Sequence, residues 1–152
     1  MLVMDLLRRL LLAAGLGAAV GLEREYRKKP AGLRTNILIA LGSASLTTLS
    51  MTIGAHGGTP DRITAQIVTG IGFLGAGAIL RSGPTVHGMT TAATIWVNAA
   101  IGMAAGAGEF VMATVTAFLT LVVLALLGPL EAYFERRAGT DGEEPSPRKR
   151  AR

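Results

Sequence analysis

TAQIVTGIGFLGAGAIL at residues 64–80 and TAATIWVNAAIGMAAGA at residues 91–107 are the two stretches that decide the fold class of this chain. No acidic residue occurs between Asp61 and Glu109, and most side chains there are apolar, small or uncharged. A helix of about 20 apolar residues crosses a bilayer, so this region is long enough to cross twice. Similar runs occupy residues 6–22, 36–53 and 110–127. The sequence therefore predicts an all-α, polytopic membrane protein, a bundle of about five transmembrane helices.

The composition agrees with a membrane protein. Of the 152 residues, 50% are hydrophobic and 16% are charged, whereas soluble domains carry about 25% charged residues. The length fits one compact unit, so we expect a five-helix transmembrane domain over residues 1–137. Residues 138–152 are rich in Gly, Glu, Pro and basic residues, which predicts a disordered basic tail. The absence of cysteine excludes a disulfide framework and a thiol catalyst.

The distribution of basic residues predicts the orientation. Twelve of the 15 basic residues lie in the loop at 24–34, at Arg81 and in the tail after residue 135. Positive charge favours the cytoplasmic side, so we expect a plasma-membrane protein with its N-terminus outside and its C-terminus in the cytoplasm. The net charge of +5 is spread between apolar runs. It therefore indicates contact with anionic membrane lipids rather than with nucleic acid.

Glycine is abundant, with 20 residues, and GIGFLG at residues 70–75 matches the dinucleotide motif. That motif needs a preceding strand and an acidic residue about 20 positions later, and neither is predicted here. We therefore expect no cofactor. Small residues instead let membrane helices approach closely. The candidate helix-packing residues, which serve folding within one chain or homo-oligomerisation, are Gly17, Gly21, Gly70, Gly72, Gly75, Gly77, Gly102 and Gly106.

Asn98 is the polar residue nearest the middle of a predicted span. It shares one helix face with Thr90 and Thr94, because all three are spaced by four residues. An amide at this depth should face the bundle or a wet cavity. Two interpretations remain open: a hydrogen bond to Gln66 or Thr69 on the third span, and a role in binding or transport.

Glu23 lies at the predicted cytoplasmic end of the first span. It can form a salt bridge with Arg27, Arg34 or Arg81, or it can have an ionic or regulatory role. Acidic residues are too sparse on this side for a magnesium site, which usually needs several oxygen ligands. We therefore expect no metal site. The sequence has no convincing catalytic grouping, so we expect no enzymatic activity.

His87 lies in a Gly/Pro loop, residues 81–88, that leads into the fourth span. The hydroxyl groups of Thr90 and Thr91 can cap that helix. Alternatively, the positive end of the helix together with Arg81 can bind an anion. A plain capped turn and an anion site both remain open.

Three blocks carry a family resemblance: GLERE at 21–25 followed by AGLRT at 31–35, AQIVTGIGFLGAG at 65–77, and GMTTAATIW at 88–96. Together they resemble the MgtC/SapB family of bacterial inner-membrane proteins over about residues 10–108. The resemblance implies a five-span domain and a link to magnesium homeostasis and virulence. It also implies restraint of the proton-driven ATP synthase rather than transport of Mg²⁺. The positions that match the family motifs are Glu23, Arg24, Arg34, Gln66, Arg81, Thr90 and Thr91.

Two departures qualify the resemblance. Virulence-type relatives add a soluble C-terminal domain where this chain is expected to have only a short tail, and His87 stands where the family usually has Arg. Three functions follow for testing. The chain can be a regulator that binds a membrane partner, a small oligomeric ion transporter or channel (including Mg²⁺-related transport), or a lipid-binding structural protein.

Overall fold

The computed structural model describes residues 3–59, 61–82 and 85–140. Over these residues the chain is built from five helices: α1 (Val3–Tyr26), α2 (Leu33–Ala55), α3 (Asp61–Gly77), α4 (Met89–Ala107) and α5 (Phe110–Thr140). The predicted all-α class is therefore confirmed. Both ends of each helix lie within a few residues of the ends of the corresponding predicted span, except that α5 runs well beyond residue 127.

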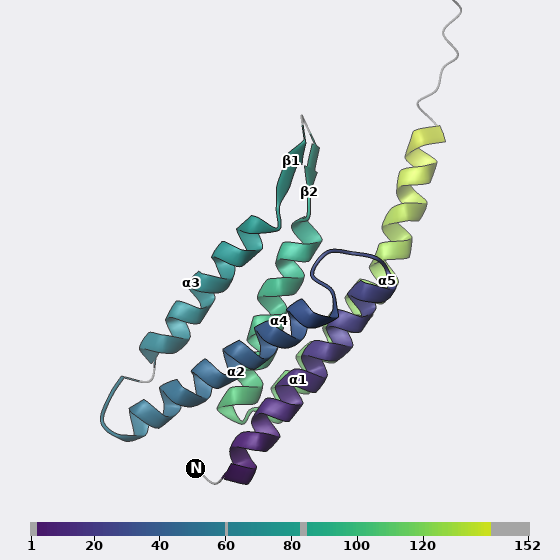
Figure 1. Cartoon of the computed structure of the whole chain (residues 1–152). Coiled ribbons are helices and arrows are strands. Elements are labelled where there is room, and N and C mark those ends of the chain that lie inside the picture. Colours follow the sequence, from purple (N-terminus) through teal and green to yellow (C-terminus); the bar gives the residue numbers. More distant parts are fainter. Residues whose placement is uncertain (1–2, 60, 83–84, 141–152) are drawn as a thin grey trace, which may run out of the picture. The chain divides into compact units, whose positions relative to one another are not determined.

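A short hairpin between α3 and α4 was not predicted. Strand β1 (Leu80–Ser82) pairs antiparallel with β2 (Thr85–His87), so that Leu80 lies opposite His87 and Arg81 opposite Val86. In Figure 1 the hairpin extends past the adjoining ends of α3 and α4. Most of the described part of the predicted loop at 81–88 thus belongs to two paired strands, whose backbone groups bond to each other.

The chain divides into two compact units, Met1–Leu121 and Val122–Arg152. α5 continues to Thr140, three residues into the segment expected to be a disordered tail, and residues 141–152 lie outside the described residues. The candidate functional site described below belongs to the first unit.

Within the first unit, α2 has the central position, because it packs against α1, α4 and α3. α3 packs mainly on α4 (Figure 1). Their contact is apolar and includes Ile67 and Ile71 of α3 and Ile95 and Ala99 of α4, with Ile39 of α2 completing the cluster. Since these residues recur three to four positions apart on each helix, they form one buried stripe.

Two of the helices are long and apolar enough to cross a membrane: α2, and α5 over Phe110–Gly128. The other three described helices fall short of that criterion. α3 has only 17 residues, and α1 contains Asp5, Arg8 and Arg9 near its start. α4 is diluted by threonine, asparagine and glycine. That α1, α3 and α4 also cross the membrane, as the five expected spans require, therefore remains a prediction.

Candidate functional site

Arg24 is the only charged residue among the buried side chains of the described core, with 4% of its surface exposed. Its Nη2 donates a hydrogen bond to Thr91 Oγ1 on α4 at 2.7 Å. Nε and Nη2 also lie 3.4 Å from the carbonyl oxygen of Pro30. One guanidinium therefore joins α1, the α1–α2 turn and the first turn of α4, which suits its rigid fork of donors.

Burial lowers the pKa of the Arg24 guanidinium, while the neighbouring Glu23 carboxylate raises it. Arg24 lies beyond residue 22, where the first predicted span ends. Since an arginine pKa begins far above neutrality, Arg24 stays protonated at physiological pH. The buried site therefore keeps a fixed positive charge.

Asn36 and Asn98 form the second part of the site, and both are fully buried. Asn98 Nδ2 donates to the main-chain oxygen of Asn36 at 2.6 Å, which ties α4 to α2. The Asn36 amide nitrogen in turn donates to the carbonyl oxygens of Ala31 and Gly32. We call Arg24, Asn36, Thr91 and Asn98 the polar seam, because together they connect α1, α2 and α4.

The polar seam leaves two acceptors without partners. Asn36 Oδ1 and Asn98 Oδ1 are buried and accept no hydrogen bond from the described residues. Both amide nitrogens face main-chain carbonyls, which only accept, so rotating either amide by 180° would place oxygen against oxygen. An unpaired buried acceptor costs about 1–3 kcal/mol. A small hydrogen-bond donor would therefore bind favourably at these two oxygen atoms.

Glu23 lies beside Arg24 on α1 and is mostly buried. Its Oε1 lies 2.6 Å from Arg27 Nε, an ion pair across one helical turn. Oε2 is buried and has no hydrogen-bond partner among the described residues. Of the three partners predicted for Glu23, the structure therefore pairs it with Arg27.

The α1–α2 turn is held on both sides. Arg24 binds it at Pro30, and Asn36 binds it at Ala31. Two non-glycine residues, Lys28 and Ala31, have φ of 54° and 56°, a conformation that costs roughly 1–2 kcal/mol per residue. The hydrogen bonds to the turn offset that strain, so the polar seam also fixes the path of the chain between the two helices.

Glycines close the space around the polar seam. A methyl group added at Gly17 would lie 2.8 Å from Ala40 Cβ, and one at Gly21 would lie 2.7 Å from Leu33 Cα. On α4, Gly102 meets the main chain at Ala40 and Gly106 meets it at Ala44. Helix backbones touch here because no side chain separates them.

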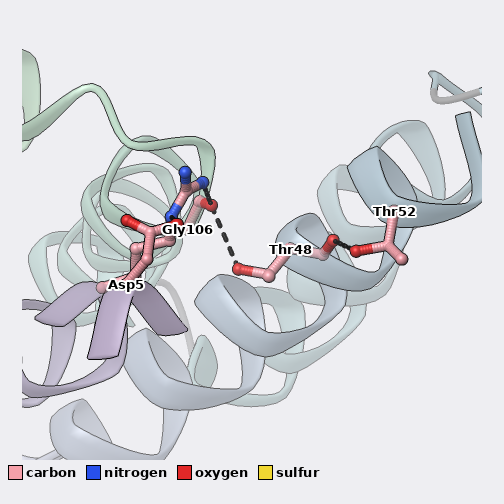
Figure 2. A network of polar contacts seen from close by, with 5 residues as sticks. Asp5, Thr48, Thr52 and Gly106 are labelled. Atoms are coloured by element: carbon pink, nitrogen blue, oxygen red, sulfur yellow. Dashed lines mark hydrogen bonds and ion pairs between the residues drawn. The ribbon is translucent and has the colours of Figure 1, made fainter. Parts of the chain in front are cut away.

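The far end of α4 is fixed by a second polar cluster. The carbonyl oxygen of Gly106 accepts hydrogen bonds from Arg9 Nη1 at 2.6 Å and from Thr48 Oγ1 at 3.0 Å. Arg9 Nε also pairs with Asp5 Oδ2 at 3.1 Å. Figure 2 shows the hydrogen bond from Thr48 to the Gly106 carbonyl, and Asp5 in the same polar cluster. A guanidinium at a helix C-terminus satisfies a free carbonyl and complements the helix dipole.

Several predicted residues lie away from the polar seam. Gln66 and Thr69 are exposed on α3, so the predicted bond from Asn98 to either was wrong: Asn98 faces α2 instead. Arg34 is exposed in the first turn of α2, and Arg81 and His87 are exposed on the hairpin. The structure thus brings together Glu23, Arg24, Thr91 and Asn98, but not the remaining candidates.

The predicted capping of α4 by threonine hydroxyls was also wrong. Gly88 is the N-cap residue, with φ of 89°, and no side chain caps the helix. A side chain at Gly88 would collide with the carbonyl oxygen of Ala78, so the turn requires glycine. Thr90 is exposed, while the Thr91 hydroxyl is used by Arg24.

The glycines of α3 differ from those of the polar seam. Nothing lies within 4 Å of a methyl group built at Gly70, Gly72 or Gly77, and Gly75 makes ordinary contact with Ala92. Within this chain, the first three therefore pack against no neighbouring helix. Of the two predicted uses of these glycines, close packing would therefore have to involve another molecule.

Three residues of structural importance, Asn36, Arg9 and Glu25, were not among the site candidates predicted from the sequence. Glu25 accepts a hydrogen bond from the Leu33 main-chain nitrogen at 3.2 Å and so caps α2 from the preceding helix. A polar residue inside or next to an apolar run is the signal that marks Asn36 and Arg9.

No group of three or more His, Asp or Glu side chains able to hold a metal ion occurs within the searched, described residues. An open groove of about 1080 Å³ lies between α2 and α3, with Thr91 and Ile95 of α4 at its base. The groove is lined mostly by apolar residues and glycine.

The fold and the polar seam define a helical membrane protein in which α1, α2 and α4 are tied by a buried arginine–asparagine arrangement. The chain belongs to the MgtC family, whose model matches residues 10–133. It is 47% identical to Protein MgtC of Salmonella typhimurium (strain 14028s) over 84% of this chain and 54% of that protein. It is 46% identical to Protein MgtC of Brucella abortus (strain 2308) over 81% of this chain and 51% of that protein.

An uncharacterized protein of Synechocystis is 44% identical over 86% of this chain and 56% of its own length. The chain thus spans about half the length of the curated relatives that it matches. No solved structure matches this chain. The family assignment therefore concerns the helical part shared with these relatives.

Proposed function

We propose that this chain is a small regulatory protein of the bacterial inner membrane that binds and modulates a partner membrane complex such as the proton-driven ATP synthase. Under this proposal its action supports growth when magnesium is low. Membership of the MgtC family supports the link to magnesium through the name alone. The multi-pass arrangement, with the N-terminus outside and the C-terminus in the cytoplasm, is part of the same proposal and rests on the basic loop and tail.

The observation that favours a regulator is the contrast between a closed interior and a helix, α3, whose outer side leaves large apolar side chains exposed. Gly102 and Gly106 bring α4 against the main chain of α2, so the interior beside the polar seam is filled by backbone contacts. α3 leaves Phe73 80% exposed and Leu74 52% exposed. A rigid core with an apolar helix at its side suits a protein that acts by binding another membrane protein.

The test is ATP-driven proton pumping in inverted membrane vesicles, with and without the protein. We expect wild-type protein to lower pumping and Asn98→Leu to lose part of that effect. Arg34→Ala serves as the control at an exposed predicted position. Insertion and abundance of each variant are measured in the same vesicles. Unchanged pumping with abundant, inserted wild type would reject the ATP synthase as the partner.

A small oligomeric ion transporter or channel, including one for Mg²⁺, is the second candidate. The unpartnered Asn36 Oδ1 and Asn98 Oδ1 favour it, because buried acceptor oxygens are a feature of cation pathways. Ion flux in proteoliposomes of purified protein tests this function. Flux that depends on Asn98 would support the transporter, whereas no flux from correctly inserted protein would reject it.

A further inference from the structure

The groove between α2 and α3 lies on the side of α2 away from its tight glycine contacts with α1 and α4. It extends from Pro30 and Ala31 at one end to Leu46 and Ile63 at the other. α3 has 17 residues, which corresponds to a helix of about 25 Å. The groove therefore follows most of the depth of a bilayer hydrocarbon core, which is about 30 Å thick.

Three glycines in this groove are not needed for close packing among the described residues. Gly42 on α2 and Gly70 and Gly77 on α3 line the groove, and a methyl group at any of them would meet nothing within 4 Å. Glycine in a helix interior is less favourable than alanine. Lipid chains adapt to either residue, whereas a helix backbone gains from close approach to glycine. The open glycines thus favour a helix as the occupant.

Two polar side chains in the same groove lack partners. Ser43 is 3% exposed, and its hydroxyl makes no hydrogen bond with the described residues. The amide of Gln66 is likewise without a hydrogen bond to the described residues. Both side chains line the groove. An acyl chain offers neither donor nor acceptor, while a polar side chain on another helix offers both.

We propose that the groove between α2 and α3 receives one transmembrane helix of a partner membrane protein, with a polar side chain of that helix bonded to Ser43 and Gln66. This inference rests on the proposed regulatory function and names the surface through which it acts. Gly42, Gly70 and Gly77 allow the backbone of the incoming helix to approach. Phe73 and Leu74 on α3 supply the surrounding apolar contact.

The first experiment compares Gly70→Leu with Gly15→Leu in the vesicle pumping assay. Both glycines are exposed and helical, and a Cβ added at either meets no atom within 4 Å, so the two substitutions begin from matched surroundings. Gly70→Leu should raise the amount of protein needed for half-maximal inhibition at least tenfold, and Gly15→Leu should leave it unchanged. Equal inhibition by both variants and wild type would overturn the groove while leaving the regulatory function intact.

The second experiment uses the absence of cysteine from the chain. The variant Gly70→Cys, or Gly15→Cys as the control, is crosslinked in native membranes, and the products are identified by mass spectrometry. The expected product joins position 70 to a transmembrane helix of the ATP synthase, and it is lost with Gln66→Leu. Crosslinks only between two copies of this chain would overturn the proposal, as would equal products from positions 15 and 70.

The two experiments separate the two hypotheses. If wild type does not affect pumping, the proposed partner fails. A single identified membrane helix crosslinked at position 70, and sensitive to Gln66→Leu, then supports the groove with a different partner. If neither pumping nor crosslinking responds, both the groove and the regulatory function fail.

Discussion

The two sides of α2 use the same kind of residue in opposite ways. On the closed side, Gly17, Gly21, Gly102 and Gly106 bring α1, α2 and α4 into backbone contact. On the groove side, Gly42, Gly70 and Gly77 meet nothing within 4 Å. Small residues at helical spacing therefore mark surfaces that permit close approach, and only the tertiary structure tells which of them are already occupied.

The largest predicted difference between the two sides is the change in unfolding free energy when a glycine is replaced by alanine. Gly102→Ala places Cβ against the main chain of Ala40, where α4 crosses α2, and should destabilise the protein by about 1–3 kcal/mol or more. Gly70→Ala enters open space and should be neutral or stabilising by up to about 1 kcal/mol. Reversible unfolding in mixed detergent micelles measures both, and equal losses would contradict the distinction between the two sides.

The next difference concerns the charged residues. Arg24→Gln removes the guanidinium bonded to Thr91 and Pro30, and hydrogen bonds of charged groups contribute about 1.5–3 kcal/mol. Arg34→Gln changes an exposed side chain in the first turn of α2, directly after the same loop, and should alter the unfolding free energy by less than about 0.5 kcal/mol.

A double-mutant cycle of Arg24→Gln with Thr91→Val isolates the bond between these two residues. The cycle should give a coupling energy of at least about 0.5 kcal/mol, as residues in one hydrogen-bond network usually do. Strict additivity of the two substitutions would show that Arg24 stabilises the protein through the α1–α2 turn alone.

The third difference compares two amides. Asn98→Leu removes the bond to the Asn36 main-chain oxygen, and interhelical hydrogen bonds in membranes contribute about 0.6–1.7 kcal/mol. Gln66→Leu, on the groove side, removes no bond to any described residue and should not lower stability. The same unfolding assay tests the pair. A larger loss of unfolding free energy for Gln66→Leu than for Asn98→Leu would contradict this prediction, because it would make the groove amide the stabilising one.

The sequence predicts the helices well because apolar length alone requires them. It also places Asn98 toward the bundle interior, because an amide that faced lipid would be energetically costly. It does not identify Asn36 as the neighbour, because periodicity defines a helix face but not the helix that packs on it. The motif at 70–75 is richer in glycine than the pair at 102 and 106, yet Gly70 and Gly72 have no neighbour within 4 Å of an added methyl group, whereas Gly102 and Gly106 lie against the main chain of α2. Arg24 is marked by family resemblance, whereas its bond to Thr91, 67 residues away, needs the fold.

The smallest predicted difference concerns two threonines. Thr48 donates to the Gly106 carbonyl across the α2–α4 contact, while Thr69 donates weakly within α3 to Ala65 at 3.5 Å. Thr48→Val keeps the shape of the side chain and should cost about 0.6 kcal/mol, the average for a bond between membrane helices. Thr69→Val should cost nothing measurable, because its partner already accepts a helix bond. Since Arg9 also binds Gly106 O at 2.6 Å, the Thr48 effect should grow when Arg9→Met is present. An unchanged Thr48 effect in that background would mean that the two donors stabilise the end of α4 independently.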